Sequence, residues 1–189
     1  MYKSVVDIWN GALAMLPHDR RIESIDEDST EALRMRDLWD RVRHQVITKH
    51  EWGWLTHATP MICGAHCNHA TNAFSYPYPQ GAIRVIGLFD KDGRRVKCDV
   101  ANHIIFSPAS TASIRYLPDC TDVEKYPVWF ADALVTALAE NAAPLFHGAS
   151  NNSRLVAQSN LRLSEAIRID SSEAQWSGTD GRTFAKARV

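Results

Sequence analysis

Residues 28–50 read DSTEALRMRDLWDRVRHQVITKH, and this stretch sets the first part of the architecture. Its apolar side chains recur every three or four positions, a spacing that places them on one face of an α-helix. The stripe consists of Met35, Leu38, Trp39, Val42 and Val46. Asp28 followed by Glu31 predicts a capping box at the start of this helix. Lys49 and His50 lie at its other end, where the helix dipole favours positive charge.

Three further segments have helical periodicity. Residues 3–16 carry an apolar stripe, and Pro17 is expected to end that helix. Residues 128–146 are apolar almost all round and rich in alanine, which is typical of a helix buried on several sides. Pro144 is expected to kink or end this third helix. A fourth helix is expected over residues 152–172.

Between the second and third helices the hydrophobic period changes. Short segments rich in β-branched and aromatic residues alternate there with turn signals, at 52–59, 72–76, 82–89, 94–100, 102–107 and 112–117. Asp92-Gly93 lies between two of these segments, and Asp-Gly is the strongest short-range hairpin signal. The pattern therefore predicts an antiparallel β-sheet inserted between helices.

The predicted fold class is α+β. Residues 1–51 and 119–173 are expected to form a bundle of about four helices, and residues 52–118 an inserted antiparallel β-sheet domain. The remaining residues, 174–189, lose periodicity and are expected to form an extended C-terminal arm.

The length, composition and net charge of the chain are those of an ordinary globular protein. The chain has 189 residues, of which 45% are hydrophobic and 23% charged, with a net charge of −1. This balance argues against a dedicated nucleic-acid binder, because phosphate contacts dominate that affinity. The N-terminal segment is too interrupted by polar residues for a signal peptide or membrane span, and the four cysteines without an export signal indicate reduced thiols. We therefore expect assembly in the cytosol, with no membrane partner.

Residues 61–80, MICGAHCNHATNAFSYPYPQ, offer the clearest candidate for metal chemistry. Four side chains that could bind zinc lie within seven positions: Cys63, His66, Cys67 and His69. A tetrahedral ion usually takes ligands from well-separated chain segments, so four ligands this close together strain that geometry. The favoured interpretation is a loop that leads into a strand, without a metal or other cofactor. A small zinc-binding regulatory or interaction module remains the alternative, and metal analysis of the purified protein distinguishes the two.

No catalytic signature is present: there is no Gly-x-Ser-x-Gly elbow, no His-Glu-x-x-His and no Gly-rich phosphate loop. Asp37 and Asp40 lie on the expected exposed side of the long helix. Three arginines share that side: Arg36, Arg41 and Arg43. This favours a solvated or subunit-facing charged surface over an acid–base pair. The chain is therefore not expected to be an enzyme, and a sugar hydrolase has only these general carboxylates in its favour.

Four stretches resemble one family in their order and spacing. They are SVVDIWNGALAMLP at 4–17, IESIDEDSTEALRMRDLWDRVRHQVITKHEWGW at 22–54, FSYPYPQGAIRVIGLFD at 74–90 and YPVWFADALVTALAENAA at 126–143. The shared features are a Trp-Asn-x-Ala-Leu helix, an Ile-x-Ser-x-Asp-Glu-x-Ser opening of the long helix, a Tyr-x-Tyr-Pro segment before an Arg-Val strand, and a Phe-x-x-Ala-Leu helix. Together they resemble the tail tubular protein A family, the head-to-tail adaptor (connector) proteins of tailed bacteriophages.

The chain departs from that family's pattern at one place. The family often has Leu-Pro-x-Asp-Cys before the Arg-Val strand, whereas this chain has PQGAI at 79–83. The departure concerns the local turn and leaves the other three stretches as they are.

The resemblance implies a structural role in the virion, in the phage neck, after assembly in the host cytoplasm. Such adaptors form a dodecameric ring between the portal protein and the tail nozzle or tubular protein, around the channel through which DNA is ejected without specific binding. Their C-terminal arm commonly docks on the portal. The candidate portal-interface residues of this chain are Trp176, Arg182, Phe184, Lys186 and Arg188.

Overall fold

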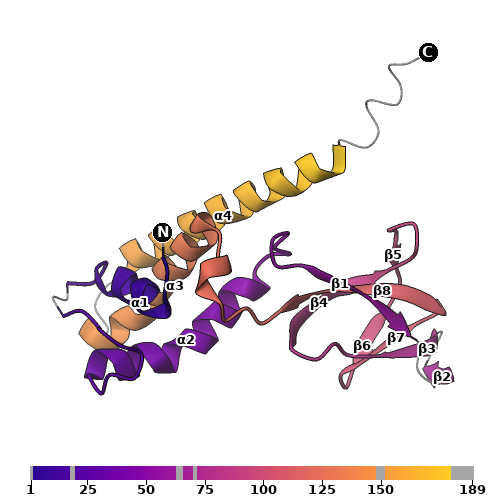
Figure 1. Cartoon of the computed structure of the whole chain (residues 1–189), viewed down its shortest axis with the longest axis horizontal. Helices are drawn as coiled ribbons and strands as arrows, with labels where there is room; N and C mark the ends of the chain where they lie inside the picture. The colour runs from indigo at the N-terminus through magenta and orange to yellow at the C-terminus, as the bar shows by residue number, and fades with distance from the viewer. Residues whose placement is uncertain (1, 18–19, 63–65, 70–71, 148–151, 180–189) are drawn as a thin grey trace, which may run out of the picture. The chain divides into compact units, whose positions relative to one another are not determined.

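A computed structural model describes residues 2–17, 20–62, 66–69, 72–147 and 152–179, without the side chains of residues 62, 66–69, 72–73, 147 and 174–179. Its helices are α1 (Val5–Leu13), α2 (Thr30–Thr48), α3 (Val128–His147) and α4 (Ser153–Thr179), with a 3-10 turn at Val123–Lys125 (Figure 1). Its strands are β1 (His57–Ile62), β2 (His66–His69), β3 (Asn72–Pro77), β4 (Ala82–Phe89), β5 (Arg95–Val96), β6 (Asp99–Ala101), β7 (Ile104–Ser107) and β8 (Thr111–Pro118). The predicted α+β fold class is confirmed.

The chain divides into two compact units. The helical unit consists of Met1–Trp54 and Cys120–Val189 and holds the four helices, whereas the β unit is Leu55–Asp119 and holds the strands. In the sequence the β unit therefore interrupts the helical unit between α2 and α3.

Helix α3 is the centre of the helical unit, because it contacts α1, α2 and α4. Its buried apolar side chains are Phe130, Ala131, Ala133, Leu134, Val135, Leu138, Ala139, Ala142 and Ala143. This burial confirms the prediction for the alanine-rich segment. Pro144 lies inside α3 without ending it, since the helix continues to His147. A proline this close to the C-terminus removes one backbone hydrogen bond, and only a short last turn depends on it.

The N-terminus of α2 is capped by Ser29, whose Oγ accepts a hydrogen bond from the backbone N–H of Ala32 at 3.3 Å. The prediction of a box formed by Asp28 and Glu31 is therefore wrong by one residue. Serine and aspartate are equally good N-caps, so a sequence that offers both at adjacent positions leaves the choice to tertiary packing. Ser29 is the buried one of the two.

Helix α1 has the complete capping box that α2 lacks. The N–H of Asp7 donates to Ser4 Oγ at 3.1 Å, and the N–H of Ser4 donates to Asp7 Oδ2 at 3.1 Å. The N–H of Lys3 also donates to the Asp7 carboxylate, and this bond is the main cause that holds the pKa of Asp7 below its ordinary value. The segment before α1 is thus fixed by one side chain.

Trp52 and Trp54 pack inside the helical unit, so the prediction of a strand over 52–59 is wrong for its first five residues. The Trp52 ring is fully buried, and its centroid lies 5.7 Å from that of Trp129 and 5.2 Å from that of Phe130. Trp54 contacts Phe130 too, with ring centroids 4.9 Å apart. Aromatic stacking of this kind outweighs the β propensity of tryptophan.

Helix α4 is longer than its periodicity predicts. It continues to Thr179, so residues 174–179 of the expected extended arm are helical and the predicted arm is corrected there. The segment contains Ser177 and Gly178, which lower helix propensity by up to about 1 kcal/mol each. It contains no proline, and lengthening an existing helix adds a hydrogen bond for each residue that is fixed. Residues of low helix propensity can therefore extend a helix that they would not nucleate.

The β unit contains two four-stranded antiparallel sheets instead of the single sheet expected. The first has the order β1-β8-β4-β5 and the second β2-β3-β7-β6. Their shared core contains Leu88 and Ile114 from the first sheet with Tyr76 and Ile105 from the second. The predicted strand over 94–100 splits into β5 and β6, which belong to different sheets.

Two tight turns shape the strand pairs. Asp90 Oδ1 accepts the N–H groups of Asp92 and Arg94 at 2.9 and 2.8 Å, which forms the turn predicted from Asp92-Gly93. The second turn, between β6 and β7, is made by Asn102 and His103, both with positive φ (51° and 57°). Two such residues in a row are typical of the type I′ hairpin, in which asparagine is well tolerated.

We expect Trp52→Ala to destabilise the helical unit by about 3–5 kcal/mol, because it removes a large buried ring. Trp52→Phe keeps an aromatic ring but loses the indole N–H that donates to the carbonyls of Val46 and Ile47, and should cost about 1–2 kcal/mol. Urea unfolding followed by helical circular dichroism measures both. Val128→Ala, at a side chain that is 54% exposed, is the control, and an effect of Trp52→Ala no larger than this control would contradict the assignment.

Candidate functional site

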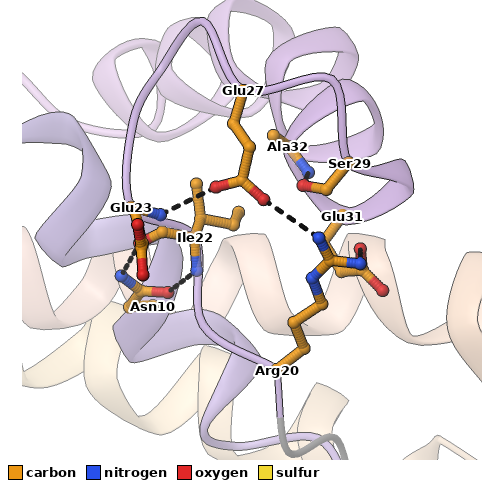
Figure 2. A network of polar contacts seen from close by, with 8 residues as sticks. All are labelled: Asn10, Arg20, Ile22, Glu23, Glu27, Ser29, Glu31 and Ala32. Carbon is orange, nitrogen blue, oxygen red and sulfur yellow. Dashed lines mark hydrogen bonds and ion pairs between the residues drawn. The ribbon is translucent and has the colours of Figure 1, made fainter.

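A polar clamp joins α1 to the loop before α2, and its first member is Asn10 (Figure 2). Asn10 Nδ2 donates to the carbonyl oxygen of Ile22 at 2.8 Å, and the N–H of Ile22 donates to Asn10 Oδ1 at 2.8 Å. One amide side chain therefore satisfies both backbone groups of one residue. Ile22 is buried, so those groups would be costly to leave unpaired. Asn10 fixes where the loop crosses α1.

Glu27 closes the same loop, as Figure 2 shows. Its carboxylate accepts the backbone N–H of Glu23 at 2.8 Å and pairs with Arg20 Nη2 at 3.3 Å. Arg20 Nη1 also lies 3.7 Å from Glu31 Oε2 in the first turn of α2. We call the six residues Asn10, Arg20, Ile22, Glu23, Glu27 and Glu31 the α1–α2 clamp.

The charge of Glu27 is stabilised inside the clamp. The hydrogen bond from the N–H of Glu23 is the main cause that holds the pKa of Glu27 below its ordinary value of 4.5, and Ser29 and Arg20 act in the same direction. A carboxyl whose pKa is lower in the folded state stabilises the fold above its unfolded pKa, and the contribution is lost as pH falls through the lowered value. The clamp therefore weakens under acid conditions and stays intact at neutral pH.

Four of the six clamp residues come from the two N-terminal motifs of the sequence. Asn10 belongs to Trp-Asn-x-Ala-Leu, and the preceding Trp9 is buried against Trp39 of α2, with ring centroids 6.4 Å apart. The second motif, Ile-x-Ser-x-Asp-Glu-x-Ser, supplies Ile22, Ser24, Asp26, Glu27 and Ser29. Ser24 Oγ accepts the N–H of Asp26 at 3.3 Å, and Ser29 caps α2. The two motifs therefore describe one local structure.

A cavity of about 410 Å³ opens beside the clamp. Its lining consists of Asp7, Asn10, Gly11, Leu13, Ala14, Arg20 and Arg21. The Asp7 carboxylate is occupied by backbone N–H groups, and Arg20 is paired within the clamp. The described contacts of these two side chains hold the segment before α1 and the loop before α2.

The four zinc candidates are not brought together by any described contact. Cys63 lies outside the described residues, and His66, Cys67 and His69 are in β2, whose side chains the structure does not describe. The expectation of a loop is wrong for these three, because β2 is an edge strand that pairs antiparallel with β3. Among the side chains that are described, no group of three or more His, Cys, Asp or Glu is arranged to hold a metal. Zinc binding by β2 stays a hypothesis.

The portal-interface candidates also stay predictions. Trp176 is in the last turns of α4, and its side chain is not described. The other four, Arg182, Phe184, Lys186 and Arg188, lie outside the described residues.

A second polar contact, which periodicity could not reveal, ties α4 to the end of α2. The carboxylate of Asp170 is 3% exposed, and both of its oxygens lie 3.0 Å from the backbone N of Gly53. His50 Nε2 lies 3.0 Å from Asp170 Oδ2. Both oxygens are thus engaged in holding the segment after α2. Residues more than a hundred positions apart cannot be paired from one sequence without an alignment.

The prediction that Arg43 lies on an exposed charged surface of α2 is wrong, because its side chain is buried, with 1% exposure. Nη1 donates to Asp40 at 2.6 Å, and the guanidinium lies 5.4 Å from the centre of the Trp39 ring. An arginine on a helix can lay its stem and head group along apolar neighbours, so spacing alone does not decide its exposure. Asp40 itself is exposed.

The sequence matches no protein-family model and no curated protein. In the described part of the chain, no helix has both the length and the apolar character needed to cross a membrane.

We expect Asn10→Ala to cost about 1–3 kcal/mol, because both backbone groups of buried Ile22 lose their partner. Asn10→Asp should not restore this stability at neutral pH, because a carboxylate can accept the Ile22 N–H but places a second acceptor oxygen against the Ile22 carbonyl oxygen. Amide hydrogen exchange of Ile22 and urea unfolding measure the effect. The control is Asn160→Ala on the exposed side of α4, and equal effects of Asn10→Ala and this control would contradict the clamp.

Proposed function

We propose that this chain is the repeating subunit of a ring-shaped adaptor between the portal and the tail nozzle of a tailed bacteriophage. In this role it is a structural virion protein without catalytic activity, and the ring surrounds the channel for DNA ejection. Its partners are copies of itself, the portal protein and the nozzle protein.

One observation carries the proposal: residues of the first two of the four resembling stretches, 4–17 and 22–54, form a single contact network. Asn10 belongs to one motif and Ile22 to the other, yet they are hydrogen-bonded to each other. Glu27 and Ser29, from the second motif, tie the loop and cap the following helix. Residues that depend on one another structurally are harder to match by chance than residues that share only a composition.

The surface of the helical unit supports a role in assembly. Six of its large apolar side chains are at least 39% exposed: Ile25, Leu33, Val128, Leu145, Val156 and Leu161. Four of the six are on α3 and α4, and the resemblance implies that helices pack against neighbouring subunits around the ring. Covering such side chains is a usual source of free energy for association.

The C-terminal segment fits attachment to a second protein. Residues 180–189 read DGRTFAKARV, with three basic residues against one aspartate and a single aromatic. They follow α4, whose last buried residue with a described side chain is Asp170. A short basic segment with one aromatic anchor is suited to docking on a larger partner.

Ring formation can be tested by native mass spectrometry and electron microscopy of the purified protein, alone and mixed with the portal of the same phage. We expect a closed ring stacked coaxially on the portal. A chain that stays monomeric and does not bind the portal would refute the adaptor proposal. The subunit count of the ring is measured in the same experiment.

Deletion of residues 180–189 should weaken attachment to the portal by about tenfold or more, because hot-spot side chains at an interface dominate affinity. The midpoint of unfolding should stay unchanged, since every described residue is retained. Trp176→Ala in the full chain separates the contribution of α4 from that of the last ten residues. Unchanged portal affinity in both variants would exclude the C-terminal segment as the docking element.

A further inference from the structure

The net charge of −1 is the sum of two different units. The β unit, Leu55–Asp119, contains six Lys or Arg against four Asp and no Glu, which gives +2. The remaining 15 Lys or Arg against 18 Asp or Glu give the helical unit −3. The near-neutral total, which argued against nucleic-acid binding, therefore conceals a basic β unit.

Two of its arginines lie on the outer face of the first sheet. Arg115 on β8 is paired opposite Gly87 on β4, and Arg95 on β5 is paired opposite Phe89 on β4. Positions 87 and 89 are two apart along one strand, so they share a face. Leu88, between them, points into the core of the β unit. Arg95 and Arg115 therefore flank β4 on the side away from that core.

Each of these guanidinium groups rests on a neutral partner. Arg115 lies over the Phe89 ring, 4.0 Å from its centre, and Arg95 Nη2 donates to the carbonyl oxygen of Ile86 at 2.6 Å. Gly87 leaves room for Arg95, because a β-carbon there would lie 3.1 Å from Arg95 Nε. Within the described residues neither guanidinium is paired with a carboxylate. Both positive charges, and most of their N–H donors, stay open to an external anion.

The neighbouring β4–β5 turn adds Lys91 and Arg94, both exposed. Of the two aspartates in this turn, Asp90 already accepts two backbone N–H groups through Oδ1. Four cations thus gather at one end of the first sheet. Arginine is especially suited to phosphate, because its planar fork can donate two parallel hydrogen bonds.

We propose that the outer face of the first sheet binds the phosphate backbone of double-stranded DNA, with Arg95 and Arg115 as the main contacts. This goes beyond the adaptor role, in which DNA only passes through, and it does not depend on the ring. Binding through phosphates alone is independent of base sequence and weakens steeply with salt. The protein should therefore bind DNA with low affinity and without preference for a particular base sequence.

The chemistry of the face favours DNA over an acidic protein surface. Protein interfaces are usually built around exposed apolar anchors and are depleted of charge at their centre. The large exposed apolar side chains described in the β unit, Val100 and Ile104, are on the second sheet. Phe89, on the first sheet, is covered by Arg115. A polar face with a net positive charge and without such an anchor is typical of DNA interfaces.

The test is fluorescence anisotropy of a labelled duplex of about 20 base pairs, titrated with the full-length protein at several salt concentrations between about 50 and 200 mM. Binding should be independent of duplex sequence. The double variant R95Q/R115Q should reduce the slope of log affinity against log salt by about 2, one for each lost phosphate contact. R95K/R115K keeps both charges and should retain most of the binding.

The matched control is R154Q/R168Q, which removes the same charge from exposed positions on α4 and should leave the salt slope unchanged. Circular dichroism checks that each variant is folded. If R95Q/R115Q does not fold, the single variants R95Q and R115Q decide: each should reduce the slope by about 1, and an unchanged slope in both overturns the proposal. The proposal is also overturned if the wild type does not bind duplex at the lowest salt, or if the α4 control loses as much affinity. If R95Q/R115Q loses self-association while DNA binding is unchanged, the face belongs to a protein partner instead. The other outcomes do not bear on ring formation, which is measured separately.

Discussion

The helical unit depends on an aromatic joint that holds together the points where the chain leaves it and returns to it. Trp54, the last residue before the β unit, contacts Tyr126 and Phe130, with ring centroids 5.8 and 4.9 Å away. Tyr126 in turn donates its hydroxyl to the carbonyl oxygen of Cys120, the first residue after the β unit. Because both ends of the insertion are fixed in this way, α2 and α3 can pack against each other although the chain between them forms two sheets. The α1–α2 clamp then completes the unit from the N-terminal side.

The sequence predicted the helices whose apolar pattern is unambiguous. The long helix α2 was predicted from its apolar stripe, and helix α3 from an alanine-rich segment that is apolar almost all round and is therefore buried on several sides. The Asp-Gly turn was predictable because its backbone needs a residue such as Gly93, with φ +76°. Periodicity failed where packing competes with propensity. Tryptophan has a high β propensity, but the Trp52 ring packs against Trp129 and Phe130 inside the helical unit.

The candidate site was only partly predictable. The motifs containing Asn10 and Ile22 could be recognised, yet their hydrogen bonds to each other needed the geometry of the loop. The pairing of Asp170 with Gly53 has no local signal at all, since it depends on how α4 lies against the end of α2. The two-sheet arrangement was missed for a related reason: the chain changes sheets within the segment 94–100, and every residue there is compatible with a single strand.

The attachment of Asp170 to Gly53 has a mechanical consequence. Asp170 is the last residue of α4 that is buried with a described side chain, and Ser172 and Glu173 beyond it are exposed. Tension applied to the C-terminal end of α4 is therefore borne first by a buried carboxylate and passes to the backbone of Gly53. Gly53 is bonded directly to Trp54, where the aromatic joint begins. Tension on the C-terminal end of α4 is therefore transmitted to Trp54, the residue directly before the β unit, through two hydrogen bonds and one peptide bond.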